Sequence, residues 1–291
     1  MFVERFIKTV YISFYKDENY KLLCEIKKNN KTIDSSKEEF DSKEKFIEYI
    51  NSYLEDYARV YISTFINTIN QGIIPSCNKN EYKKREIEIE NIKYICIKNS
   101  YSIYISIYDL MSIKKEYPFD LDFIFSIFAP IDYTAKQRNN TFYVLILKEK
   151  IAIIGYKNGI PIYSDIFELK EENEEHDEVE EDIELLEEID LEEEISTDIE
   201  EEAENIEIEE KPEDLTLTTI EHSIIKNLKE AIKDYYENFS DDFLEKIIFL
   251  DTVNIGKEIK KLTEDEILLD SDIINFDLLK TLNILSESEN V

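Results

Sequence analysis

The segment TFYVLILKEKIAIIGYKNGIPIYSDIF, Thr141 to Phe167, decides the fold of this chain. It contains three short runs rich in β-branched and aromatic residues, and tight turns separate them. Asn158-Gly159 is a pair that tolerates positive φ, and Pro161 stands near the start of the third run, where a missing N–H is easily accommodated. The pattern predicts a three-stranded antiparallel meander with strands at 142–147, 151–156 and 160–167.

Directly after the meander the composition becomes strongly acidic. Residues 168–214 contain 27 Asp and Glu against Lys170 and Lys211, a net charge of −25. The whole 291-residue chain carries −33, which leaves −8 for the other 244 residues. The tract has too little apolar content to offset the entropy of ordering, so we expect a solvated, disordered insert. Alternatively, Ile183, Leu186 and Ile189 approximate one helical face that could fold against a basic partner.

Beyond the acidic tract, helices and strands alternate. Apolar residues from Leu217 to Tyr235 recur at helical spacing and predict an amphipathic helix over 216–238. A buried strand, a short helix, another strand and a last helix should follow, at 246–250, 255–262, 266–269 and 277–285. The second half of the chain therefore has the order β-β-β-(insert)-α-β-α-β-α.

The start of the chain has the same order. Three strands are predicted at 6–14, 21–27 and 31–35. Ser42 can cap a helix over 43–56, in which Phe46, Ile47 and Ile50 share one face. A buried strand follows at 59–65. This opening β-β-β-α-β unit indicates a duplicated architecture with two lobes.

The segment between the two units predicts an inserted subdomain. Residues 69–86 resemble a loop, and two alternating runs, 86–98 and 101–108, form a probable hairpin. Asp109 can cap a short helix that ends before Tyr117, and Pro130 can begin another over 131–137. We place the first lobe at 1–140, with the inserted subdomain at about 66–128, and the second lobe at 141–291.

A β-β-β-α-β unit that occurs twice, with a strand-and-helix module between, is the plan of the actin-like ATPase fold. The chain more closely resembles the PilM family and the cytoplasmic domain of the GspL family. The resemblance lies in SIYISIYDLMSIKKEYPFDLDFIF (Ser102 to Phe125), APIDYTAKQ (Ala129 to Gln137), the meander, and IEHSIIKNLKEAIKDYYEN with EKIIFLDT beyond the acidic tract. It implies a bilobal α/β protein of actin-like plan.

The nucleotide-binding turns of that fold are altered here. Such turns normally carry Asp-x-Gly followed by Ser or Thr, because glycine lets backbone N–H groups approach phosphate oxygens. The matching turns, Tyr15 to Asn19 and Lys148 to Lys150, contain no glycine. The turn that would hold the nucleoside, Leu250 to Asn254, also lacks its usual glycine pair. We therefore expect an actin-like protein that has lost its nucleotide, with no cofactor and no catalytic residue.

The resemblance also implies a function. In that family a non-catalytic cytoplasmic scaffold binds a short peptide of an inner-membrane PilN-like protein, which pairs with a PilO-like protein. Host machines include type IV pili, type II secretion, DNA uptake and scaffold disks of flagellar motors. We expect a cytoplasmic protein, peripheral at the inner-membrane face, with many copies in a ring or lattice. Two alternatives are an ATPase with unorthodox nucleotide loops and an acidic adaptor that binds basic partners through residues 168–214.

The predicted partner contact lies on the hairpin. An extended peptide could add a strand to its exposed edge, with backbone hydrogen bonds for affinity and side-chain pockets for register. The residues that we assign to this contact are Tyr94, Tyr101, Tyr104 and Tyr108.

Other kinds of site are not expected. Cys24, Cys77 and Cys96 are odd in number and widely spaced, so we expect reduced thiols rather than a disulfide or a metal site. His176 and His222 should face solvent. Nucleic acid is not expected as a partner, because phosphate binding needs clustered Lys and Arg. No apolar run approaches the length of about 18 residues that a membrane span needs.

The composition of the acidic tract gives a testable prediction. Replacing residues 171–211 with a short Gly-Ser linker should leave the melting temperature within a few degrees, because the tract has little apolar surface to pack. Differential scanning calorimetry measures this change. Loss of folded protein after the deletion would show that the tract packs on the core.

Overall fold

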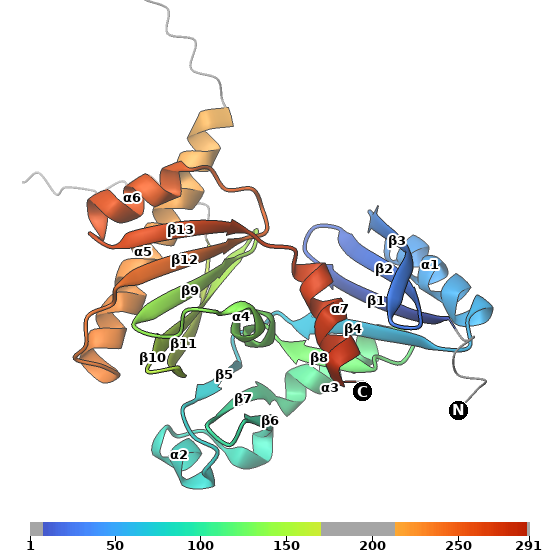
Figure 1. Cartoon of the computed structure of the whole chain (residues 1–291), viewed down its shortest axis with the longest axis horizontal. Helices are drawn as coiled ribbons and strands as arrows, with labels where there is room; N and C mark the ends of the chain where they lie inside the picture. Colours follow the sequence, from blue (N-terminus) through green and yellow to red (C-terminus); the bar gives the residue numbers. More distant parts are fainter. Residues whose placement is uncertain (1–7, 170–212, 290–291) are drawn as a thin grey trace, which may run out of the picture.

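The computed structural model describes residues 8–169 and 213–289, which form two lobes and a small inserted module (Figure 1). Residues 170–212, which make up most of the acidic tract and include His176, and the start of the first expected strand lie outside the described residues. Both lobes are mixed α/β structures.

The first lobe is built on a five-stranded sheet with the order β3-β2-β1-β4-β8. β1, β2 and β3 form an antiparallel meander, whereas β4 is parallel to both β1 and β8. Asn29 and Asn30 form the β2–β3 turn at φ of 54° and 58°, a left-handed conformation that asparagine tolerates. The strands are β1 (Thr9–Lys16), β2 (Tyr20–Lys28), β3 (Lys31–Phe40), β4 (Val60–Ile66) and β8 (Phe123–Ser126).

Helix α1 (Lys43–Asp56) covers one face of this sheet. Ser42 caps the helix, since its side chain accepts a hydrogen bond from the backbone N–H of Lys45. Phe46 and Ile50, one turn apart on α1, are fully buried between the helix and the sheet. The ring of Phe46 lies 4.9 Å from that of Phe14 on β1, so the helix is fixed by an aromatic core.

The second lobe repeats this arrangement with the strand order β11-β10-β9-β12-β13. Again the first three strands form an antiparallel meander and the fourth is parallel to both its neighbours. Helices α5 (Glu213–Asn238) and α6 (Glu258–Glu266) cover one face, in a core that includes Phe142, Ile224 and Ile259. The strands are β9 (Thr141–Ile146), β10 (Lys150–Lys157), β11 (Ile160–Glu168), β12 (Lys246–Asp251) and β13 (Asp270–Asn275).

The module is inserted between β4 and β8 and has its own sheet, with the order β5-β7-β6. β5 lies beside β11 of the second lobe, where the backbone N–H of Ile73 donates a hydrogen bond to the hydroxyl of Ser164 at 2.9 Å. The module therefore touches both lobes. Its elements are β5 (Gln71–Ile74), α2 (Lys79–Lys84), the 3-10 helix η2 (Ile89–Asn91), β6 (Ile92–Ile97), β7 (Tyr101–Ser106) and α3 (Ile107–Glu116).

Two crossing helices join the lobes. Helix α4 (Phe128–Thr134) follows the first-lobe sheet but packs on β9 and β10, whereas α7 (Leu278–Glu289) follows the second-lobe sheet but packs on β1 and β4 (Figure 1). The hydroxyl of Ser13 on β1 donates to the carbonyl oxygen of Leu279 at 2.7 Å. One continuous apolar core, with Phe65, Phe128 and Leu282 among its members, contains residues of both lobes and of the module.

These features confirm the predicted fold class, a bilobal α/β protein with a duplicated β-β-β-α-β unit and an inserted subdomain. The helix over 43–56 has the predicted bounds. Other predicted positions were wrong. Residues 69–86 contain β5 and α2 rather than a loop, and the strand expected at 266–269 is β13, Asp270–Asn275. Leu268 adopts φ of 62° before that strand, so the strand begins only after this turn.

The shared core predicts that the lobes depend on each other for stability. Leu282 on α7 is fully buried in that core, so Leu282→Ala should lower the free energy of unfolding by about 2–5 kcal/mol. Leu54→Ala, the same change at a position on α1 that is 41% exposed, should change it by only about 0.5 kcal/mol. Urea denaturation should show one shifted transition. Two transitions, of which Leu282→Ala shifts only one, would contradict the shared core.

Candidate functional site

Two turns face each other across the cleft between the lobes. One joins β1 to β2 and contains Asp17 and Glu18, and the other joins β9 to β10 and contains Lys148 and Glu149. The ammonium group of Lys148 forms an ion pair with the carboxylate of Glu18. The two turns that resemble phosphate-binding turns therefore do lie opposite each other, and their side chains bridge the space between them.

The cavity between these turns is small. It has a volume of about 20 Å³ and is also bounded by Thr252 and Val253, whereas ligand pockets are typically about 300–1,000 Å³. The hydroxyl of Thr252 donates to the carbonyl oxygen of Ile146 at 2.7 Å. The ammonium group of Lys150 donates to the carbonyl oxygen of Asn67 at 2.9 Å. Polar groups that could contact a phosphate are thus bonded to the protein backbone.

The charges of the cleft also oppose a polyphosphate. Asp17 forms an ion pair with Lys21 at 2.8 Å, and its carboxylate also accepts a hydrogen bond from the backbone N–H of Asn19 at 3.1 Å. Lys148 is engaged by Glu18. A phosphate group would therefore have to displace carboxylates from both the lysines and the backbone donors of these turns.

A larger cavity of about 390 Å³ opens between β2–β3 and the end of β13. Glu38, Glu39 and Asp277 form part of its wall. Its lysines are already paired, because Lys37 lies 2.7 Å from Asp277 across the two lobes and Lys21 bonds Asp17. This mixture of charges does not suit a polyanion either.

A groove of about 230 Å³ separates α3 from the carboxyl ends of β1 and β4. In its wall, Asp109 accepts hydrogen bonds from the hydroxyl of Thr68 at 2.7 Å and the amide of Asn70 at 3.2 Å. The side-chain oxygen of Asn67 in the same wall is buried and has no hydrogen-bond partner in residues 8–169 and 213–289. Three apolar residues that are next to lining residues in the sequence are exposed: Ile69 (61%), Tyr108 (70%) and Met111 (49%). The groove itself is thus lined by polar side chains such as Thr68 and Asp109 together with the rings of Tyr15 and Tyr117.

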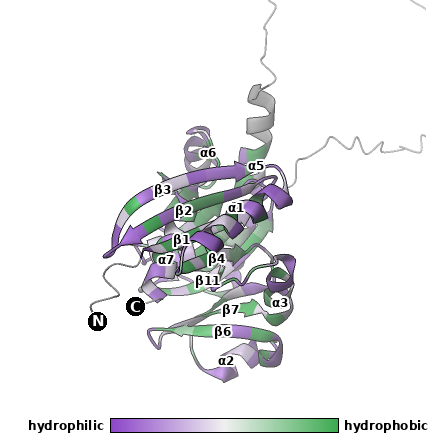
Figure 2. Cartoon of the chain, turned by 90° about the vertical axis from the view of Figure 1, so that its right-hand side faces the viewer, coloured by the Kyte–Doolittle hydropathy of each residue, from purple (hydrophilic) through white to green (hydrophobic). Residues whose placement is uncertain are grey.

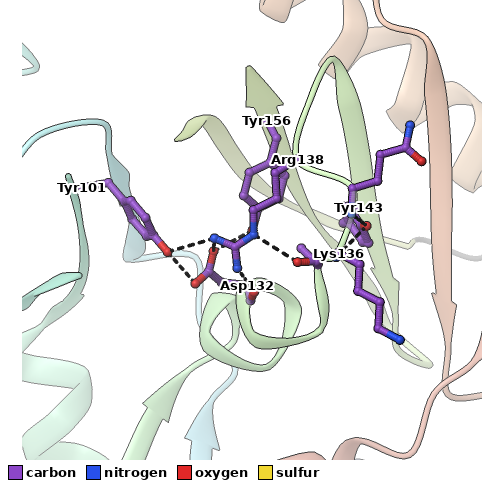
Figure 3. A network of polar contacts seen from close by, with 8 residues as sticks. Tyr101, Asp132, Lys136, Arg138, Tyr143 and Tyr156 are labelled. Atoms are coloured by element: carbon purple, nitrogen blue, oxygen red, sulfur yellow. Dashed lines mark hydrogen bonds and ion pairs between the residues drawn. The ribbon is translucent and has the colours of Figure 1, made fainter. Parts of the chain in front are cut away.

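A buried polar network joins the module, α4 and the second lobe (Figure 3). The carboxylate of Asp132 on α4 accepts hydrogen bonds from the hydroxyl groups of Tyr101 on β7, at 2.6 Å, and Tyr156 on β10, at 2.7 Å. Arg138 Nη1 lies 3.4 Å from the same carboxylate. Burial, followed by the adjacent Asp132, raises the pKa of both tyrosines well above the ordinary value, so both remain protonated donors.

The four tyrosines predicted to bind a partner lie in different surroundings. Tyr101 is only 3% exposed and belongs to the polar network. Tyr94 and Tyr104 are cross-strand neighbours and half-buried; Tyr104 packs so closely on Gly72 that a Cβ atom there would lie 2.7 Å from its hydroxyl oxygen. Tyr108 lies on α3, not on a strand. Partner binding stays a prediction, and Tyr108 is the one of the four whose ring faces solvent.

The prediction for the cysteines was wrong in part. Cys77 and Cys96 form a disulfide, with Cα atoms 5.5 Å apart, because the loop after β5 returns alongside β6. The sequence did not indicate this pairing, since the β5 strand itself was missed. Cys24 is a buried free thiol, as expected, and burial raises its pKa to about 11.

No metal centre is apparent in the part of the chain that the structure describes. Within the described ranges no three His, Cys, Asp or Glu side chains are placed to hold a metal ion. The only described histidine, His222, lies on α5 and is exposed. None of the helices described here has both the length and the apolar character that crossing a membrane requires.

Several solved structures are similar to this chain. A protein of unknown function with an actin-like ATPase fold from Bacteroides thetaiotaomicron is 14% identical, with a TM-score of 0.48 over 97% of this chain and 98% of the other. The PilM–PilN type IV pilus biogenesis complex gives 8% identity and a TM-score of 0.47 over 95% and 94%. The cytoplasmic domain of EpsL, from the type II secretion system of Vibrio cholerae, gives 8% and 0.44 over 97% and 95%. No curated protein matches the sequence.

The topology defines a bilobal protein of actin-like fold, in which the β1–β2 turn and the β9–β10 turn are bridged by the Lys148–Glu18 ion pair. Residues 6–132 match the family model described as domain of unknown function DUF8569, and residues 142–291 match that of domain of unknown function DUF8341. The second match covers more than half of the chain, and the chain belongs to the DUF8341 family.

The polar network gives a prediction for module attachment. Tyr101→Phe removes a hydrogen bond to a buried carboxylate and should lower the free energy of unfolding by about 1.5–3 kcal/mol. Tyr108→Phe removes the hydroxyl of an exposed ring and should change it by at most about 0.5 kcal/mol. Chemical denaturation of both variants measures the difference. Equal stability of the two variants would mean that the network does not hold the module.

Proposed function

We propose that this protein is a non-catalytic, actin-like scaffold that acts by binding another protein. The observation that carries this proposal is the narrow space between the two turns, in which the Lys148–Glu18 ion pair and a cavity of about 20 Å³ stand where the phosphates of a nucleotide would lie. An enzyme that transfers phosphate needs charges and donors aimed at the transferred group. Here the corresponding groups are bonded to one another.

The groove beside α3 is the partner site that the geometry favours. Its wall carries the polar side chains of Thr68 and Asp109, and the exposed Ile69 and Tyr108, each next to a lining residue in the sequence, would cover apolar side chains of a peptide. Figure 2 colours parts of α3 and β6 as hydrophobic in sequence. An extended peptide with one or two apolar residues would fit this surface.

The resemblance to the PilM family supplies the kind of partner. Under this proposal the peptide belongs to an inner-membrane protein of the PilN kind, paired with one of the PilO kind, and the scaffold lies in the cytoplasm at the membrane face. One short peptide gives modest affinity, so several copies in a ring or lattice would add avidity. The machine would be a pilus, a secretion or DNA-uptake system, or a flagellar-motor disk.

The closed cleft predicts the absence of nucleotide binding. Isothermal titration calorimetry of the full chain with Mg-ATP at millimolar nucleotide should show no saturable heat, because the two turns lack glycine and the cavity between them is only about 20 Å³. The alternative, an ATPase with unorthodox loops, predicts micromolar affinity for Mg-ATP. Such a result would contradict the proposal.

The groove predicts how the chain reaches a membrane. Tyr108→Asp should move the protein from the membrane fraction to the supernatant in cells that contain its natural partners, because a charge replaces an exposed apolar contact. Tyr133→Asp, at a ring on α4 that is 52% exposed, is the matched control and should leave fractionation unchanged. Circular dichroism should confirm that both variants are folded. If folded Tyr108→Asp still fractionates with membranes, the contact lies elsewhere.

A further inference from the structure

The Cys77–Cys96 disulfide joins parts of the module that the sheet keeps apart. Cys77 follows β5 and Cys96 lies on β6, while β7 runs between these two strands. The bond encloses residues 78–95, which contain α2 and η2. A cross-link of this span stabilises the segment by limiting the open conformations available to it.

A second, non-covalent contact holds the same segment. Tyr82 on α2 is fully buried, its ring lies 5.1 Å from that of Tyr94, and its hydroxyl is hydrogen-bonded to that of Ser102. The segment therefore keeps one anchor when the disulfide is opened. Reduction would loosen it rather than detach it.

The disulfide is placed for exchange with a thiol in solution. Cys96 is exposed, so an attacking thiolate can reach its sulfur. Each sulfur also has an acceptor nearby for the hydrogen that it gains on reduction: Cys77 Sγ lies 3.3 Å from the carbonyl oxygen of Tyr101, and Cys96 Sγ lies 3.9 Å from Oδ1 of Asn99. The reduced pair can thus remain in the same backbone conformation.

The third cysteine does not compete in this exchange. Cys24 is 1% exposed on β2 of the first lobe, within the core beneath α1. Burial raises its pKa to about 11, which keeps it a thiol rather than a reactive thiolate. Exchange is therefore confined to Cys77 and Cys96.

We propose that Cys77–Cys96 is a reversible redox site that sets how firmly residues 78–97 of the module are held. A dithiol reductant attacks Cys96 Sγ as a thiolate, forms a mixed disulfide and releases Cys77 as a thiolate, which takes up a proton. The second thiol of the reductant then displaces Cys96, which is protonated in turn. The pair gains two electrons and two protons, and the dithiol becomes a disulfide.

The consequence reaches the junction with the second lobe. Tyr101, whose carbonyl oxygen lies beside Cys77, donates its hydroxyl hydrogen to Asp132 on α4. The Cys77–Cys96 bond therefore lies next to the residue, Tyr101, whose hydrogen bond to Asp132 attaches the module to α4. The argument for a regulatory role rests on the proposed cytoplasmic location, where disulfides are typically transient and redox-sensing. The exchange itself can be tested on the isolated chain, independently of nucleotide or partner binding.

Hydrogen exchange on the full chain tests this inference. The protein, purified without reductant, is compared with the same protein in millimolar dithiothreitol. Amide exchange in residues 78–97 should be faster by about 100-fold after reduction, the ratio expected for opening a loop of this length, while β9 and β12 should not change. In the variant with both Cys77→Ser and Cys96→Ser, amide exchange in residues 78–97 should be as fast as in the reduced natural chain, and dithiothreitol should not change it. Cys24→Ala should respond as the natural chain does.

Alkylation of the native protein gives the second readout. Cys77 and Cys96 should be modified only after reduction, and Cys24 only after unfolding. Three results would overturn the inference: modification of Cys77 and Cys96 without reductant, resistance of the bond to dithiothreitol in the folded chain, or reduction that leaves exchange in residues 78–97 unchanged.

Discussion

The packing of each lobe's last helix against the other lobe is the contact on which the rest of this structure depends. Helix α7 belongs to the second lobe in sequence, yet Asn283 bonds the carboxylate of Glu25 on β2 at 3.1 Å and Glu287 pairs with Lys27 at 2.6 Å. Helix α4 lies against the second-lobe sheet in the reciprocal position. Neither lobe can bury its inner sheet face without the helix of the other, so a single core spans both.

The apolar core shared by the two lobes also explains why the two turns lie so close together. An exposed ion pair such as Lys148–Glu18, with side chains 48% and 66% exposed, contributes only about 0–1 kcal/mol. It cannot hold two lobes together by itself. The shared apolar core fixes the lobes at this distance, and the ion pair occupies the space between the turns.

Much of the fold could be predicted from the sequence because it depends on local signals. Ser42 and the apolar spacing after it fixed α1, and the Asn158-Gly159 pair fixed the β10–β11 turn, where φ is 52° and 83°. Features that depend on tertiary contacts could not be predicted. Strand β5 has only four residues and is recognisable only through its pairing with β7. The pairing of Cys77 with Cys96 required that strand to be placed first.

The candidate site was predicted in a similarly partial way. The resemblance to the actin-like plan matched the turn at Tyr15 to Asn19 with the turn at Lys148 to Lys150, and Glu18 and Lys148 of these turns do form an ion pair. The alternating run 101–108 predicted a strand whose tyrosines contact a partner. Tyr101 instead points into the core towards Asp132. Tyr108 belongs to a helix that Ser106 caps. Asn67 and the groove beside α3 carry no local sequence signal, because they arise where two separate elements approach each other.

A crystal structure of the full chain grown with magnesium and a non-hydrolysable ATP analogue tests the central claim most directly. The account predicts that the Lys148–Glu18 ion pair stays in place and that electron density between the two turns shows no nucleotide. Analogue phosphates bound between those turns, with the ion pair opened, would contradict it.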